Sequence, residues 1–193
     1  MASRVSAASQ FAVYGPTFLD VVMGPLDGPP VPGREAWVEG ALMCAGGAAN
    51  QAIALARLGA PVRLHSRVGV DQMGVFVDEM LAREGVDTSS CERVGDQNLT
   101  VSLSFDGDRA MTTRGTTALP LLGGDAPACL LADARGIGAN SEVVSSWRAR
   151  GTWVLADTAW DEAGTWDEAD LEALHLADVC TPNEEEALAY ART

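Results

Sequence analysis

Residues 45–59, Ala-Gly-Gly-Ala-Ala-Asn-Gln-Ala-Ile-Ala-Leu-Ala-Arg-Leu-Gly, carry the clearest indication of the fold class. Apolar residues recur at helical spacing after the glycine pair, and Gly59 stands where a helix commonly ends. The pattern therefore predicts a helix that begins directly after Gly47. Strand patterns flank this helix at 36–42 and 62–68. Strands that alternate with helices are typical of a parallel sheet covered by helices.

The same alternation is predicted along most of the chain. Residues 23–33 are rich in proline and glycine and are predicted to be a loop. We expect one α/β domain over residues 1–193. Further strands are predicted at 11–15, 129–133, 152–157 and 177–181, and further helices at 76–84, 141–150 and 168–176.

Residues 99–113 depart from this alternation and predict an antiparallel hairpin. Apolar and polar residues alternate from Leu99 to Asp106, and Asp106-Gly107 is a strong signal for a tight hairpin turn. We expect this half-polar hairpin to form a small sheet attached to the main one, as a lid would.

Composition narrows the classes of function. Twenty-seven acidic and thirteen basic residues give a formal net charge of −14, which disfavours binding to nucleic acid or to an anionic membrane surface. All thirteen basic residues are arginine, so a P-loop lysine and Schiff-base chemistry are excluded. The four cysteines show no Cys-x-x-Cys spacing, which makes a zinc site improbable. With no secretory signal or membrane span in the sequence, we expect a cytoplasmic protein.

Two short stretches could carry binding chemistry. Gly46 and Gly47 allow a ligand to approach the backbone, and Asn50 lies in the first turn of a helix whose N-terminus is electropositive. Asp20 follows the first strand, at the edge of an open sheet where ligands bind, and its carboxylate can accept bonds from two hydroxyl groups. A tight turn and an ordinary loop aspartate are the alternative interpretations, and the residues alone leave them open.

The sequence Thr181-Pro-Asn-Glu184 reads as a capping box with proline at the first helical position. It predicts a helix that starts at Pro182. The chain ends about two turns later, so we expect it to be a truncated portion of a longer fold.

Four motifs run in order along the chain. They are Gly15…Asp20, Gly46-Gly-Ala-Ala-Asn-Gln-Ala52 with Leu55-Ala-Arg-Leu-Gly59, Val68-Gly-Val-Asp71…Gly74, and Thr181-Pro-Asn-Glu-Glu-Glu186. Together they resemble the ribokinase-like (PfkB-type) carbohydrate and nucleoside kinases. The resemblance implies a three-layer sheet with helices on both faces and a small β-sheet lid, here formed by 34–43 and 98–114. It covers only the N-terminal portion of such a kinase, so the C-terminal part of the fold is missing.

This resemblance also implies site residues, cofactors and partners. By family analogy Asp20, Gly46, Gly47 and Asn50 bind the sugar, while Asn183 and Glu186 organise phosphate and Mg²⁺, with Glu186 as the metal residue. A single Glu acting through water is adequate for Mg²⁺. The implied function is phosphoryl transfer from ATP to a sugar hydroxyl. Pairing through the lid into a homodimer is a further implication.

Two departures from the family pattern limit this implication. Ala48 stands where ribokinases commonly have a lysine, so ribose is not the favoured substrate. Many ribokinases also have a glutamate after the middle strand, and Asp133 is the nearest acidic residue to that position here. The family's Gly-x-Gly-Asp segment, which holds the catalytic base, does not occur before Thr193. We therefore assign no catalytic residue to this chain and expect the chain alone to be inactive.

Three other functions remain open. The chain could be a non-catalytic sugar-binding or dimerising remnant, or a relative of the nucleoside kinases. A dinucleotide-dependent oxidoreductase fits the alternation of elements, but the third spaced glycine of a dinucleotide-binding motif is missing.

Overall fold

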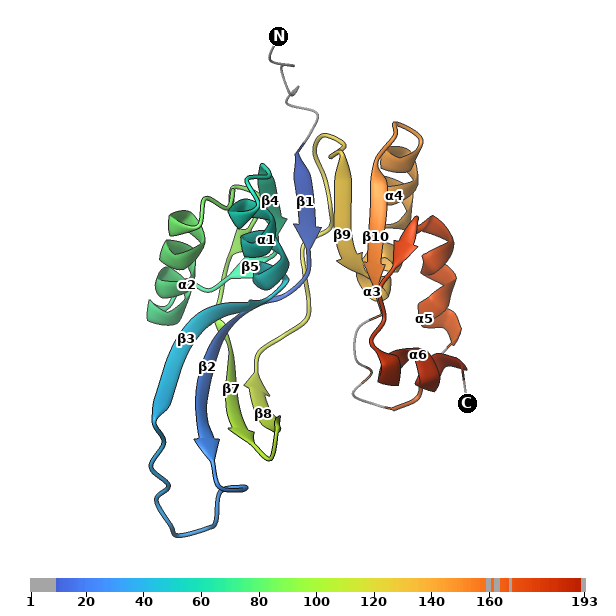
Figure 1. Ribbon diagram of the computed structural model, residues 1–193. Helices are drawn as coiled ribbons and strands as arrows, with labels where there is room; N and C mark the ends of the chain where they lie inside the picture. Colours follow the sequence, from blue (N-terminus) through green and yellow to red (C-terminus); the bar gives the residue numbers. More distant parts are fainter. Residues whose placement is uncertain (1–9, 159–160, 162–163, 167, 192–193) are drawn as a thin grey trace.

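The computed structural model describes residues 10–158, 161, 164–166 and 168–191. Its main sheet is parallel, with the strand order β11-β10-β9-β1-β4 (Figure 1). All five strands therefore present their carboxyl ends at the same edge, where ligands collect in open α/β sheets. The strands are β1 (Phe11–Tyr14), β4 (Val62–His65), β9 (Cys129–Asp133), β10 (Trp153–Asp157) and β11 (Val179–Cys180).

Helices cover both faces of this sheet. Successive side chains of a strand point to opposite faces, and here apolar side chains on both faces are buried under helices. In β1, Val13 packs in one core cluster with α1 and α2, whereas Ala12 and Tyr14 pack in another with α3 and α4. This confirms the predicted three-layer α/β architecture. The helices are α1 (Ala48–Arg57), α2 (Gln72–Arg83), α3 (Ala134–Ala139), α4 (Ser141–Arg148), α5 (Glu168–Glu172) with a 3₁₀ turn at Ala173–Leu176, and α6 (Glu184–Ala191).

A second, four-stranded sheet projects from the carboxyl edge of the main sheet (Figure 1). Strand β2 pairs antiparallel with β3 and parallel with β7, and β7 pairs antiparallel with β8. We call this the lid sheet. A separate two-stranded pair is formed by β5 (Arg67–Val68) and β6 (Glu92–Arg93). The lid strands are β2 (Thr17–Leu26), β3 (Gly40–Gly47), β7 (Asn98–Phe105) and β8 (Asp108–Arg114).

The lid sheet differs from the sequence prediction at its first two strands. Residues 23–26, predicted to be a loop, continue β2, so Asp20 lies inside a strand. Pro25 falls between Met23 and Leu26, where the register with β7 is irregular and no ladder hydrogen bond is needed. The other strand begins at Gly40 rather than at 34, and Trp37 is 86% exposed. The hairpin at 98–114 lies where the sequence predicts it.

Helix α3 has no counterpart in the sequence prediction, because Gly136 and Gly138 disfavour a helix. Asp133 caps it by accepting a hydrogen bond from Gly136 N at 2.5 Å. A Cβ on Gly136 would lie 2.9 Å from ring atoms of Tyr14, so glycine lets α3 pack closely on β1. None of the helices within the described residues combines the length and apolar character that crossing a membrane requires.

Candidate functional site

The chain leaves the main sheet and enters the lid sheet at a corner held by buried hydroxyl groups. Ser66 Oγ donates to the carbonyl oxygen of Gly15 at 2.6 Å and lies 2.9 Å from Thr17 Oγ1. Gly15 is needed here because an added Cβ would lie 2.9 Å from Ala48 Cβ. The corner fixes the direction of β2, and therefore the position of Asp20 three residues later.

Asp20 lies directly over Gly46. The two residues are on neighbouring strands, with Asp20 opposite Cys44 in register, and a Cβ added to Gly46 would overlap the Asp20 carboxylate. Partial burial raises the pKa of Asp20 above its ordinary value, and a hydrogen bond from the Thr100 side chain lowers it in part. Burial and the nearby Asp20 charge raise the pKa of the Cys44 thiol. Two of the residues expected to bind sugar are therefore in contact.

Gly47 and Asn50 lie at the start of α1. Gly47 has φ of 62°, a conformation that favours glycine, and an added Cβ would overlap the Pro16 carbonyl and lie 2.8 Å from the Phe18 ring. No side chain caps this helix, and Asn50 is exposed in its first turn. The space beside both glycines is filled by the chain itself, namely by Asp20 and Phe18. The helix N-terminus and Asn50 remain the features that face outward.

Asn183 and Glu186 form a reciprocal cap at the start of α6. Glu186 N donates to Asn183 Oδ1 at 2.8 Å, and Asn183 N donates to Glu186 Oε2 at 3.1 Å. The helix begins at Glu184, so the predicted start at Pro182 and the predicted capping box at Thr181 and Glu184 are wrong. The true box is shifted by two residues because Asn183 is itself a strong N-cap residue.

Glu186 is buried, and its carboxylate is bonded within the protein. Thr158 Oγ1 donates to Glu186 Oε2 at 2.7 Å, so this oxygen serves both the cap and the end of β10. Within the described ranges, no group of three or more His, Cys, Asp or Glu side chains is arranged to hold a metal ion. Only Mg²⁺ that keeps most of its water ligands is compatible with this donor set.

Asp133, the substitute expected for a family glutamate, is bound as the cap of α3. Burial is the main cause that raises its pKa, and the hydrogen bond from Gly136 opposes that rise. It lies at the carboxyl end of β9, whereas Asp20 belongs to the lid sheet and Asn183 precedes α6. The lid sheet and α6 both project from the carboxyl edge of the main sheet (Figure 1).

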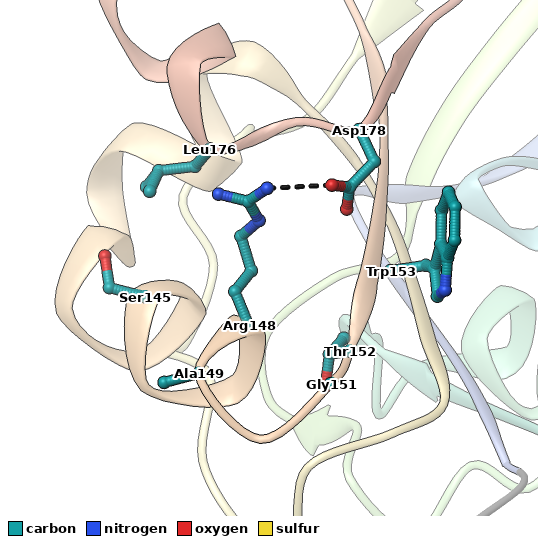
Figure 2. A pocket seen from close by; sticks show the side chains of 8 residues that line it. All are labelled: Ser145, Arg148, Ala149, Gly151, Thr152, Trp153, Leu176 and Asp178. Carbon is teal, nitrogen blue, oxygen red and sulfur yellow. Dashed lines mark hydrogen bonds and ion pairs between the residues drawn. The ribbon is translucent and has the colours of Figure 1, made fainter.

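The opposite edge of the sheet holds a hollow of about 510 Å³ (Figure 2). It is lined by Trp153 at the start of β10 and by Asp178 just before β11, so it lies at the amino ends of both strands. Arg148 Nη2 and Asp178 Oδ1 form an ion pair of 2.7 Å across it, and Asp178 Oδ2 accepts from Val154 N at 2.8 Å. These contacts tie α4 to the sheet, and none of the expected site residues lines this hollow.

The sequence interpretation missed Thr100, which lies beside Asp20 in the lid sheet, and Thr113, which lies beside Thr100 on the next strand. Their hydroxyl groups are 3.1 Å apart. The signal was available, because a tight turn at Asp106-Gly107 places residue 100 opposite residue 113. The alternation was interpreted only as one apolar face and one polar face.

Comparisons with known proteins agree with this architecture. Residues 38–118 match the family model described as pfkB family carbohydrate kinase. A 56-residue segment is 46% identical to the 2-dehydro-3-deoxygluconokinase of Bacillus subtilis (strain 168), covering 29% of this chain and 17% of that protein.

Solved structures share the fold over nearly the whole chain. A putative ribokinase from Agrobacterium tumefaciens superposes with a TM-score of 0.77 at 20% identity, covering 97% of this chain and 63% of that one. A fructokinase from Xylella fastidiosa superposes with a TM-score of 0.75 at 25% identity, covering 96% and 62%, and it was also solved with bound ATP. The chain thus spans less than two thirds of the length of these structures. Residues 38–118 thus match the pfkB family of carbohydrate kinases, and nearly the whole chain shares the ribokinase-like fold.

Proposed function

We propose that this chain is the sugar-binding and lid portion of a kinase that transfers phosphate from ATP to a sugar hydroxyl. The observation that carries this proposal is the contact between Asp20 and Gly46, where the lid sheet meets the carboxyl edge of the parallel sheet. A half-buried carboxylate at such an edge can accept hydrogen bonds from two neighbouring hydroxyl groups of a sugar. The family match and the kinase structures support the same assignment.

In this proposal, Asp20 and Asn50 orient the sugar. Asp20 accepts hydrogen bonds from sugar hydroxyl groups, and the exposed amide of Asn50 both donates and accepts hydrogen bonds. Gly46 and Gly47 contribute indirectly, because Gly46 leaves room for the Asp20 carboxylate and Gly47 leaves room for the Pro16 carbonyl and the Phe18 ring. The uncapped N-terminus of α1 adds backbone N–H groups and the positive end of the helix dipole.

Asn183 and Glu186 would lie on the phosphate side of the site. Thr158 Oγ1 and Asn183 N both donate to Glu186 Oε2, so Oε1 is the oxygen that can meet the water shell of a magnesium ion. When bound, Mg²⁺ neutralises charge that develops on the transferred phosphoryl group. The cap formed with Asn183 and the bond from Thr158 hold the Glu186 carboxylate in one orientation.

No residue is proposed as the catalytic base, because residues 1–193 contain no Gly-x-Gly-Asp segment. Phosphoryl transfer depends on positioning and charge stabilisation. The chain by itself is therefore proposed to bind a sugar without phosphorylating it. The similar proteins include a fructokinase and a 2-dehydro-3-deoxygluconokinase. Because these names refer to different substrates, they do not identify the sugar that this chain binds.

Calorimetric titration of the 193-residue chain with neutral sugars, namely D-fructose, D-glucose and D-ribose, tests this proposal. We expect binding of at least one of them, and we expect Asp20→Ala to weaken it about tenfold or more through loss of two hydrogen bonds. Asp27→Ala is the matched control, because Asp27 is an exposed acid just beyond the end of β2. If Asp20→Ala binds the sugar as tightly as the Asp27→Ala control, the assignment of the site is wrong.

A further inference from the structure

Strand β8 is the outer strand of the lid sheet, and one of its edges is unpaired. The strand order is β3-β2-β7-β8, so within the described part of the chain β8 pairs with β7 alone. All seven residues of β8 are exposed. A strand edge of this kind presents backbone N–H and C=O groups to any strand that approaches it.

The tight turn before β8 determines which backbone groups lie on this edge. Asp106 and Gly107 have φ of 52° and 79°, the two positive values that a type I′ turn requires, and Phe105 is paired with Asp108. In a two-residue hairpin the closing pair exchanges backbone hydrogen bonds, and bonded and non-bonded pairs then alternate along the strands. Asp108 and every second residue after it therefore direct their backbone groups to β7. The residues that direct theirs outwards are Arg109, Met111 and Thr113.

The side chains of these three residues share the face of Asp20. Asp20 is opposite Thr100 and Thr100 is opposite Thr113, and residues opposite each other on neighbouring strands point to the same face. By the alternation, Thr100 and Thr113 form a pair without backbone hydrogen bonds, in which side chains lie closer together. Their hydroxyl oxygens are 3.1 Å apart, which agrees with this alternation.

A second copy of this chain fits the edge of β8. Two identical strands can pair antiparallel about a two-fold axis. Placing Met111 opposite Met111 of the second copy aligns all seven residues, and Arg109 is then opposite Thr113 of the second copy. In this register, the residues that direct their backbone groups outwards exchange hydrogen bonds with one another.

Charge complementarity favours the same register. It places Asp108 opposite Arg114 of the second copy and Arg114 opposite Asp108 of the second copy. Opposite charges on facing strands stabilise such a pair, and a shift by two residues in either direction separates them. Arg114 pairs with Asp96 at 3.0 Å within its own lid sheet, and its side chain is still 54% exposed.

The pairing brings Arg109 to the sugar face of the other copy. In its own lid sheet, Arg109 lies four residues from Thr113 along β8, about 13 Å away. In the paired sheet, Arg109 of the second copy is directly opposite Thr113, with Cα atoms about 5.5 Å apart. It is then level with Asp20, about 14 Å away across three strand spacings. Side chains that rise from one face at this separation leave space for a sugar between them.

The guanidinium of Arg109 is available for this contact. Arg109 is exposed, and its backbone N, rather than its side chain, donates to Asp108 Oδ1 at 2.8 Å. No acidic side chain in the described part of the chain forms an ion pair with this guanidinium.

We propose that two copies of this chain pair through β8 and that Arg109 of each copy completes the sugar site of the other. This inference rests on the proposed sugar-binding function and adds a second copy as the partner of that site. The Asp20 carboxylate accepts hydrogen bonds, whereas a guanidinium only donates them. A sugar hydroxyl group does both, so a sugar between the two side chains is bound from both sides.

Disulfide cross-linking between two cysteine variants tests the register. Ala110 is opposite Thr112 of the second copy in a pair without backbone hydrogen bonds, so their Cα atoms lie about 4.5 Å apart, within the range of a disulfide. A mixture of Ala110→Cys and Thr112→Cys should therefore cross-link in oxidised glutathione, and each variant alone is the control that should not. All samples carry Cys180→Ser, because Cys180 is an exposed native cysteine.

Calorimetry with D-fructose, D-glucose and D-ribose tests the contribution of Arg109. Arg109→Ala should weaken binding of the preferred sugar about fivefold. Arg150→Ala is the matched control, because Arg150 is exposed just beyond α4, and it should bind as the wild type does. Asp20→Ala lacks the carboxylate but still supplies Arg109. In an equal mixture of Arg109→Ala and Asp20→Ala, random pairing gives about a quarter of the sites both groups, and these should bind with wild-type affinity.

The possible results separate the two proposals. If the wild type binds a sugar but the mixture recovers no wild-type sites, the inference is wrong and the proposed function stands. A cysteine mixture that cross-links no more than each variant alone overturns pairing through β8 in this register. Failure of the wild type to bind any of the three sugars overturns the proposed function and the role of Arg109, whereas cross-linking still decides whether β8 pairs. Circular dichroism checks that each variant is folded.

Discussion

His65 is a buried imidazole at the carboxyl end of β4, 8% exposed. Burial is the main cause that lowers its pKa, to about 4, and the positive charge of Arg63 lowers it further, while Asp87 acts in the opposite direction. The folded protein therefore holds His65 neutral at pH values where the unfolded chain already binds a proton. Acidification from about pH 6.5 to about pH 4 should favour unfolding.

His65→Asn should flatten this pH dependence. Because the pKa of His65 falls from its ordinary 6.5 to about 4, the wild-type protein should lose about 3 kcal/mol of unfolding free energy across this window that the variant does not lose. Urea titrations followed by circular dichroism at several pH values measure the difference. His175→Asn is the control, because His175 is exposed. Parallel curves for the wild type and His65→Asn would contradict this assignment. Asp87, whose pKa is lowered to about 2, titrates below this range.

Gln97 connects three elements at the root of the lid sheet. It is 1% exposed, its Oε1 accepts from Gly69 N at 2.9 Å, and its Nε2 donates to the Thr17 carbonyl oxygen at 2.9 Å. A Cβ on Gly69 would overlap the Gln97 backbone, so the two segments pack without space between them. Asn98 is the first residue of β7. Its side-chain Nδ2 donates to the Thr116 carbonyl oxygen, and its Oδ1 accepts from Thr116 N. The lid sheet is therefore fastened to the main body by buried amide groups.

Gln97→Leu should destabilise the protein by about 3 kcal/mol, because it leaves two buried backbone groups without partners. The free energy of unfolding in urea measures this loss. Gln51→Leu is the matched control, since Gln51 is exposed on α1 and we expect a change below about 0.5 kcal/mol. A similar small change in Gln97→Leu would mean that water replaces the lost amide.

Elements with strong local patterns could be predicted from the sequence, and the elements that depend on tertiary pairing could not. Helix α1 and strand β9 lie where the apolar spacing places them. The end of β2 could not be predicted, because pairing with β3 and β7 holds residues 23–26 extended although Gly24 and Pro25 favour a loop. The lid strand expected at 34–43 was displaced for the same reason, since β3 takes its register from β2.

The candidate site shows the same division. Gly46 was chosen from the sequence as a place for a ligand, yet its missing Cβ makes room for Asp20, a residue 26 positions earlier in the chain. The sequence predicts Glu186 as a metal residue, and its bond from Thr158 depends on where β10 ends relative to α6. The spacing of motifs in the sequence can predict such candidate residues. Which atoms are already bonded within the protein follows only from the packed structure.

On the scale of the whole molecule, the lid sheet is the surface on which we expect a second copy to bind. Leu42 and Met111 are 55% and 58% exposed and lie on the same face of the lid sheet as Asp20, on β3 and β8. All seven residues of β8 are exposed, so this outer strand also has a free edge that a partner strand can pair with. The family resemblance and this exposed apolar surface both favour a homodimer.

Dimerisation through the lid sheet should depend on salt as well as on concentration, because two copies with a net charge of −14 each repel one another. In sedimentation velocity, we expect the dimer fraction to rise with protein concentration and to increase further between about 0.05 and 0.5 M NaCl, as the Debye length falls. The double variant Leu42→Ser, Met111→Ser should shift the protein to monomer, since it removes apolar area that the contact would bury. Leu121→Ser is the matched control, because Leu121 is 74% exposed but lies outside the lid strands. A protein that stays monomeric at every concentration and salt, or a dimer that the double variant leaves unchanged, would show that the exposed lid face serves the sugar site alone.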